Sequence, residues 1–137
     1  MDDETEIYDA VGGDRPFFEL VERFYVGVEG DSALRALYPA DLTAGKDHLA
    51  WFLIQRFGGP AYFNQQRGEP RLRMRHHTFA ITPALRDAWM RHMLSALEAV
   101  EVFGPFLTVM TEYFEHSATF LINAEEPVAG RTPLNTV

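Results

Sequence analysis

A chain of 137 residues that is 47% hydrophobic and 23% charged has the size of one domain and enough apolar residues to fold over most of its length. Its formal net charge of −8 disfavours binding to nucleic acids, which depends on neutralising phosphates. The absence of cysteine excludes disulfide bonds and thiolate-held metal clusters.

The two ends of the chain carry no sign of export or membrane insertion. Residues 1–6 are acidic and lack the apolar stretch of a secretory signal. No uninterrupted apolar run approaches the ~20 residues that a membrane-spanning helix needs, so we expect a cytoplasmic protein without a membrane partner. Residues 126–137 are rich in proline, glycine and small polar types, and we expect a flexible tail there, after a single domain at 1–125.

Apolar residues recur at intervals of three and four in four long segments, which predicts four amphipathic helices. The first begins near Pro16, a residue suited to a first turn, and the second ends at Gly58–Pro60. The third opens at Thr82 and Pro83, with Thr82 as the expected cap, and the fourth follows the break at Gly104. The apolar faces consist, in chain order, of Phe17, Leu20, Val21, Phe24 and Val28; Leu49, Phe52, Leu53 and Phe57; Leu85, Trp89, Met93, Ala96, Leu97 and Val100; and Leu107, Met110, Phe114, Ala118, Leu121 and Ile122.

A long segment without a clear helical period runs from Gly58 to Arg75. Irregular segments of this length are uncommon in compact domains and are usually functional or packed on something. No stretch of the chain shows the alternation and turn residues expected of a β-hairpin. We therefore predict an all-α fold of four main helices, short connecting helices and this one irregular segment.

The five histidines are the first candidates for chemistry. None is spaced with another histidine or an acidic residue as zinc ligands are, and the chain has neither a nucleophile elbow nor a phosphate-binding glycine loop. We expect His48 and His116 to lie at the surface, and it stays open whether His92 contacts a ligand. His76 and His77 cannot both point inward, because adjacent side chains diverge.

Several short motifs in a fixed order carry a resemblance to a known family. The arginine-rich run Gln66–His76 (QRGEPRLRMRH), followed by Arg86–Trp89 (RDAW), is its most specific part. The chain resembles, over residues 7–124, the truncated haemoglobins of the second group, which implies the two-on-two globin fold with a haem between the helix pairs. The other matching motifs are Tyr8–Gly13 (YDAVGG), Arg23–Tyr25 (RFY), Tyr38–Pro39 (YP) and Phe57–Pro60 (FGGP).

The resemblance implies that His76 is the proximal ligand of the haem iron and that His77 points away from it. Without cysteine, a thiolate ligand and a thioether attachment are excluded, so the expected cofactor is non-covalent haem b, iron protoporphyrin IX. The same resemblance places Tyr25, Tyr38 and Trp89 on the opposite face of the haem. A phenol hydroxyl and an indole N–H in a dry pocket are expected to donate hydrogen bonds to the bound ligand.

Further positions follow from the resemblance. With a one-residue gap in the preceding loop, Gly45 falls at the distal position and Leu49 one turn later, so that a small residue leaves an open path for the ligand. Arg73, and then Arg75, are expected to pair with the haem propionates. The expected wall of the haem pocket consists of Leu72, Met74, Phe52 and Phe79.

The implied function is reversible binding of dioxygen, and also of carbon monoxide and nitric oxide. A second hypothesis is turnover of peroxide or oxidation of nitric oxide by the same haem, which would need an external reductase because the chain has no flavin fingerprint. A third is a haem-free helical sensor or interaction domain. A homodimer that uses an exposed aromatic residue such as Tyr113 stays open.

Overall fold

The computed structural model describes residues 4–126, and every regular element in that range is helical. The chain of helices follows the predicted order, with short helices between the long ones. In chain order the elements are η1 (Glu4–Glu6), α1 (Ile7–Ala10), α2 (Asp14–Glu29), α3 (Ser32–Arg35), α4 (Thr43–Arg56), α5 (Tyr62–Arg67), α6 (Leu72–His76), α7 (Pro83–Ala99), η2 (Glu101–Phe106) and α8 (Leu107–Phe120).

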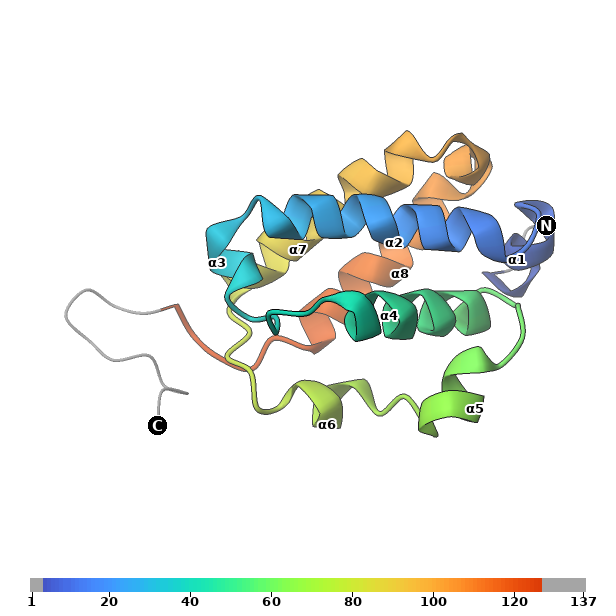
Figure 1. The fold of residues 1–137 in the computed structure, drawn as a ribbon. Coiled ribbons are helices and arrows are strands. Elements are labelled where there is room, and N and C mark those ends of the chain that lie inside the picture. Colours follow the sequence, from blue (N-terminus) through green and yellow to red (C-terminus); the bar gives the residue numbers. More distant parts are fainter. Residues whose placement is uncertain (1–3, 127–137) are drawn as a thin grey trace.

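The four long helices form two pairs. Helix α2 packs on α4 and on α7, and α7 packs on α8. In Figure 1 α2 and α4 run one above the other, α7 and α8 cross behind them, and α5 and α6 lie on the far side of α4 from α2. The predicted all-α, two-on-two arrangement is therefore confirmed.

The start of α7 follows the expected capping chemistry. Oγ1 of Thr82 accepts a hydrogen bond from the backbone N–H of Leu85 at 3.2 Å, and Pro83 occupies the first turn. The buried face of α7 includes Ala88 and Met90, whereas Leu85 and Trp89, expected on that face, are half-buried. The buried face is turned in this way because α7 packs on both α2 and α8.

Two predicted boundaries were wrong. Helix α8 ends at Phe120 with Leu121 as its C-cap, so Leu121 and Ile122 lie beyond the helix. The segment from Gly58 to Arg75 is not irregular, because it contains α5 and most of α6. The short helix α5 buries one apolar residue, Phe63, and so gives no visible helical period.

Phenylalanine fills the centre of the molecule. The ring of Phe17 lies 5.2 Å from that of Phe103, edge to face, and 6.2 Å from that of Phe57, stacked. Tyr113, expected among the exposed aromatics, is half-buried: its ring lies 5.4 Å from that of Phe57, and the guanidinium of Arg56 lies 4.4 Å from its centroid. The fully buried phenylalanines are Phe17, Phe24, Phe57, Phe103 and Phe114.

A shared carboxylate joins the N-terminal elements to α5. The Tyr8 hydroxyl donates to Oδ1 of Asp14 at 2.6 Å, and the Tyr62 hydroxyl donates to Oδ2 at 3.0 Å. The hydrogen bond to Asp14 raises the pKa of both tyrosines above the usual range, so both phenols stay protonated. This contact fixes where α5, and hence the arginine-rich run, leaves the body of the protein.

The ends of the chain fall partly outside the described residues. Residues 127–137, which are most of the expected tail, and residues 1–3 lie outside them. Glu126 is described, and its carboxylate accepts a hydrogen bond from the backbone N–H of Ala84. Within 4–126 no single helix is long and apolar enough to cross a membrane; α7 and the segment Glu101–Phe120, bent by 118°, meet that length and composition only as a pair, as buried core helices also do.

Candidate functional site

His76 is the last residue of the short helix α6. The helix starts after Arg71, whose φ of 43° turns the chain into a new direction. Nδ1 of the half-buried His76 ring lies 2.6 Å from the carbonyl oxygen of Leu72, four residues earlier. Because a carbonyl only accepts, Nδ1 carries the proton and the lone pair of a neutral imidazole is left on Nε2. That nitrogen has no hydrogen-bond partner within residues 4–126.

The surroundings of His76 are apolar and accessible. The ring of Phe79 lies edge-on at 6.4 Å, and Phe79 and Met74 leave 40% and 54% of their surface exposed. The next residue, His77, is exposed, and its Nδ1 bonds to the carbonyl oxygen of Met74 instead. His76 is therefore the histidine of this pair that combines partial burial with a free Nε2.

Three polar aromatic residues lie together, with Tyr25 of α2 and Trp89 of α7 both in contact with Tyr38. Tyr25, from α2, is 3% exposed, and its ring lies edge to face with that of Tyr38 at 5.6 Å. Trp89, from α7, packs between Phe24 and Phe114, with ring centroids at 5.1 and 5.8 Å. The Trp89 side chain hydrogen-bonds Tyr38, with the indole N–H as donor because it is the indole's polar hydrogen.

Burial keeps both phenols protonated. It raises the pKa of Tyr25 to about 12. Burial, and then the neighbouring Tyr25, raises the pKa of Tyr38 well above its usual range, against the opposing effect of the hydrogen bond from Trp89. The Tyr25 hydroxyl has no hydrogen-bond partner in the described part of the chain, so its proton is available to a ligand.

Helix α4 covers this cluster with its first turns. A Cβ on Gly45 would lie 2.9 Å from the hydroxyl oxygen of Tyr25. The phenol therefore uses the space that the missing side chain leaves, and the open path expected at Gly45 stays a prediction. Lys46 Nζ lies 5.9 Å from the centre of the Tyr25 ring and 3.3 Å from the Glu22 carboxylate. One turn later, Leu49 is half-buried against the core.

The arginines expected at the propionates differ in their contacts. Arg75 donates to the backbone carbonyls of Pro70, Arg67 and Glu69 at 2.6, 2.9 and 3.0 Å. Its guanidinium thus closes the turn between α5 and α6, which sequence spacing did not indicate. Arg73 is exposed, and its guanidinium lies 5.0 Å from the centre of the Phe120 ring.

The expected wall residues lie on α4, within the arginine-rich run and just after it. Phe52, on α4, is half-buried with its ring 5.8 Å from that of Phe63, and Leu72 is half-buried at the start of α6. Met74 lines a surface hollow together with Arg73 and with residues that follow α8.

Two histidines have partners that the sequence did not reveal. Nε2 of His92 lies 2.8 Å from Oδ2 of Asp31, and Oδ1 of the same carboxylate accepts from the backbone N–H of Leu34 and so caps α3. His48, expected at the surface, is half-buried, with Nε2 3.1 Å from a guanidinium nitrogen of Arg67. Nothing in the local sequence signals either contact, because the partners lie 61 and 19 residues apart.

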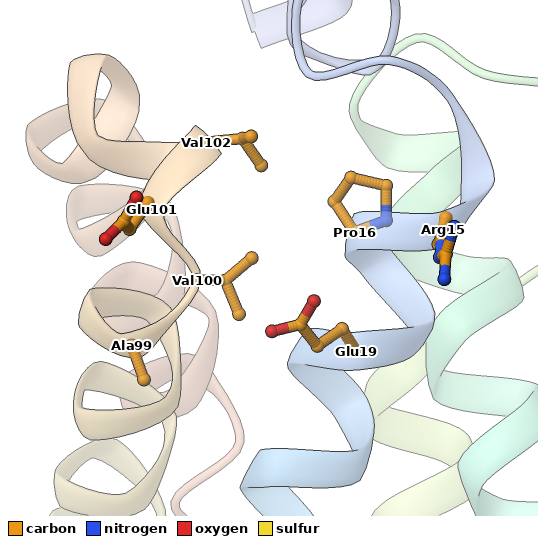
Figure 2. A pocket seen from close by; sticks show the side chains of 7 residues that line it. All are labelled: Arg15, Pro16, Glu19, Ala99, Val100, Glu101 and Val102. Carbon is orange, nitrogen blue, oxygen red and sulfur yellow. The ribbon is translucent and has the colours of Figure 1, made fainter.

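A further hollow on the surface of the described residues lies elsewhere. It separates the start of α2 from the junction of α7 and η2, and Figure 2 shows Val100 and Val102 directed across it toward Pro16. Glu19 and Glu101 add negative charge to its rim. None of the residues that line it is among those expected to bind a ligand, and its open, mixed lining has no convergent donors.

The donor set around His76 fits a haem. Within residues 4–126 no three side chains of His, Asp or Glu gather as a metal site. An iron ion held by one imidazole therefore needs its other ligands from elsewhere, and a tetrapyrrole supplies four in one plane. The free Nε2 of His76 and the exposed apolar surface of Phe79 suit such a flat apolar group.

Comparison with known proteins agrees with this geometry. Residues 6–120 match the model of the bacterial-like globin family. The chain is 33% identical over 119 residues to Group 2 truncated hemoglobin YjbI of Bacillus subtilis (strain 168), an alignment that covers 87% of this chain and 89% of that protein.

Solved structures give the same result. The hemoglobin of the thermophilic phototrophic bacterium Chloroflexus aurantiacus is 50% identical, with a TM-score of 0.83 over 85% of this chain and 97% of that one. The group II truncated hemoglobin of Bacillus anthracis is 32% identical, with a TM-score of 0.83 over 88% and 98% of the two chains. Family membership implies haem binding, and globins bind diatomic gases such as oxygen. The chain belongs to the bacterial-like globins and, within them, to the group II truncated haemoglobins.

Proposed function

We propose that this protein binds dioxygen, and also carbon monoxide and nitric oxide, at a non-covalent haem b held by Nε2 of His76. When bound, the haem supplies an iron atom with one open position for a diatomic ligand. The hydrogen bond from Nδ1 to the Leu72 carbonyl supports this role, because it fixes the tautomer and makes the imidazole a better donor to metal.

The observation that carries the proposal is the cluster formed by the buried Tyr25 and the half-buried Tyr38 and Trp89. Three elements that are distant in sequence bring two phenols and one indole together among apolar rings. A phenol is protonated at neutral pH, and burial, which raises the pKa of Tyr25 to about 12, keeps it a hydrogen-bond donor into the alkaline range. Such donors stabilise a ligand that carries partial negative charge.

The three residues play different parts in the proposal. Tyr25 is the primary donor, because its hydroxyl has no competing partner in the described range. Trp89 already donates to Tyr38, which holds the indole and the phenol in one arrangement. We expect Trp89 to share its N–H between Tyr38 and the ligand, and hence to have the smaller effect on ligand release.

Stopped-flow measurement of dioxygen release tests this assignment. Removing one hydrogen bond to the ligand costs about 1–1.5 kcal/mol, which corresponds to roughly 5- to 10-fold faster release. We expect this acceleration in Tyr25→Phe, and a smaller one in Trp89→Phe.

Tyr113→Phe is the matched control, since it removes a phenol hydroxyl from a half-buried tyrosine whose ring packs on Phe57, away from the cluster. Release that is equally fast in wild type and Tyr25→Phe contradicts the proposed donor role. Carbon monoxide, which is less polar when bound, should respond less to Tyr25→Phe than dioxygen does.

A further inference from the structure

The helix that carries His76 is weakly anchored by packing. Helix α6 has five residues and buries no side chain. Its Leu72 is only half-buried, so contacts other than apolar burial must contribute to holding the helix, since burial is the main stabilising term in most elements. On its N-terminal side the Arg75 guanidinium supplies them, with three hydrogen bonds to the backbone of the preceding turn.

On the C-terminal side, the contacts come from a residue 47 positions later. Nδ2 of Asn123 donates to the carbonyl of Phe79 at 2.9 Å and lies 3.4 Å from the carbonyl of His76 itself. Its Oδ1 accepts from the backbone N–H of Ile81 at 2.8 Å. The backbone N–H groups of Asn123 and Ala124 both donate to the carbonyl of Ile81, at 2.9 and 3.2 Å.

The orientation of the Asn123 amide is fixed by these partners. The side chain faces two carbonyls and one N–H, and an amide matches them because its NH₂ group supplies two donors and its oxygen an acceptor. A rotated amide would oppose oxygen to two carbonyl oxygens and N–H to N–H. Asn123 lies just beyond the end of α8, so it joins α8 directly to the segment that follows His76.

We infer that Asn123 is a positioning residue for the proximal side of the haem: it holds the chain between His76 and Ile81 on the end of α8 and so sets where the His76 imidazole stands. This inference rests on the proposed role of His76 as iron ligand. Asn123 does not touch the haem in this scheme. It acts through the backbone of His76, whereas Leu72 acts on the ring.

Because Asn123 is exposed, it can be substituted without disturbing the packing of the core. The residue is exposed, so Asn123→Ala removes its side-chain hydrogen bonds, and keeps the backbone bond to Ile81, without opening a buried cavity. Asn123→Asp keeps an acceptor for the N–H of Ile81 but loses both bonds donated to carbonyls. Comparing the two variants therefore separates the effect of the hydrogen bond to the Ile81 N–H from the effect of the hydrogen bond to the His76 carbonyl.

The test uses haem-loaded full-length protein. Resonance Raman spectra of the ferrous, ligand-free form report the iron–histidine stretching band, and transfer of haem to an excess of apomyoglobin reports haem loss. We expect a shifted or broadened band in both variants and haem loss on the order of 10-fold faster than in wild type, as for other supporting contacts of metal ligands. Hydrogen exchange at the Ile81 amide should be accelerated in Asn123→Ala but not in Asn123→Asp.

Asn64→Ala is the matched control for general loss of stability. The Asn64 carboxamide accepts from Gln55 at 3.0 Å and joins α4 to α5, without a bond to the segment after His76. It should lower stability and leave the iron–histidine band unchanged. A wild-type protein that takes up no haem overturns the proposed function, whereas a normal wild-type band that persists in Asn123→Ala, with unchanged haem loss, overturns only the role of Asn123.

Discussion

The short distance between position 45 and the Tyr25 hydroxyl predicts that the effect of Gly45→Ala on stability depends on residue 25. The substitution should destabilise the protein when residue 25 is Tyr and stabilise it when residue 25 is Phe. A Cβ at position 45 would lie 2.9 Å from the Tyr25 hydroxyl oxygen, closer than a normal van der Waals contact. Gly45→Ala should therefore destabilise the wild-type protein, because Tyr25 is 3% exposed and packed against Tyr38, so its ring has little room to move. In Tyr25→Phe the opposing oxygen is gone, and the same substitution should stabilise.

Two opposing contributions set the size of the effect. Overpacking a filled site costs about 1–3 kcal/mol, while replacing glycine by alanine in a helix gains about 0.5–1 kcal/mol. In the wild-type background the first exceeds the second, so we expect Gly45→Ala to lower the free energy of unfolding by about 1–2 kcal/mol. In the Tyr25→Phe background we expect a gain of about 0.5–1 kcal/mol, which gives a coupling of about 1.5–3 kcal/mol between the two sites.

A double-mutant cycle measures this coupling. The four proteins are unfolded in urea at a fixed excess of haem, and dioxygen release is measured alongside. Gly45→Ala should also speed release in the wild-type background, since the Tyr25 hydroxyl is pushed from its place, and should have little effect on release once Tyr25 is Phe. An equal change in stability in both backgrounds would refute the steric reasoning.

Three further predictions concern contacts outside the cluster. Arg75→Ala should lower the free energy of unfolding by about 1–3 kcal/mol, because it removes three hydrogen bonds between a charged guanidinium and backbone carbonyls. Arg71→Ala should be nearly neutral, and thermal melts compare the two variants. The hydrogen bond from His92 lowers the pKa of the Asp31 carboxyl below its usual value, so this interaction stabilises the fold above about pH 4 and is lost as the pH falls through the folded-state pKa. His92→Gln should therefore have a lower free energy of unfolding than wild type at pH 7, and the difference should shrink toward pH 2.5 in urea unfolding experiments. A difference that grows at acidic pH would contradict the hydrogen bond between His92 and Asp31. Gly58→Ala should prevent stable folding at physiological temperature, because φ is 100° and a Cβ would collide with the backbone carbonyl of Thr5. A melting temperature equal to that of wild type would contradict this prediction.

The long helices could be predicted from sequence because their information is local. Apolar spacing and the cap at Thr82 are set by residues within a few positions of one another, and the structure follows them. The short helix α5 was missed because its single buried side chain, Phe63, makes no period, and because Asn64 is held by Gln55 from another helix. Local pattern could not supply that partner.

In the candidate site, too, local contacts could be predicted from the sequence and long-range contacts could not. His76 could be proposed as the iron ligand from the arginine-rich motif, and its bond to the Leu72 carbonyl is local. The role of Arg75 in closing a turn depends on the exact path of the backbone, which residue types do not encode. The bonds from Asn123 to the loop after His76 join positions more than 40 residues apart, and they arise only once α8 packs against the rest of the fold.

The central claim is that the Nε2 atom of His76 binds the haem iron. Titration of purified protein with hemin, followed by the visible absorption spectrum after reduction, tests it most directly, with His76→Ala compared against His77→Ala, whose ring bonds to a different carbonyl. We expect saturation at one haem per chain in wild type and in His77→Ala, with the spectrum of a histidine-ligated haem that is lost in His76→Ala. An unchanged spectrum in His76→Ala, or no absorbance change in the wild type, would contradict the account.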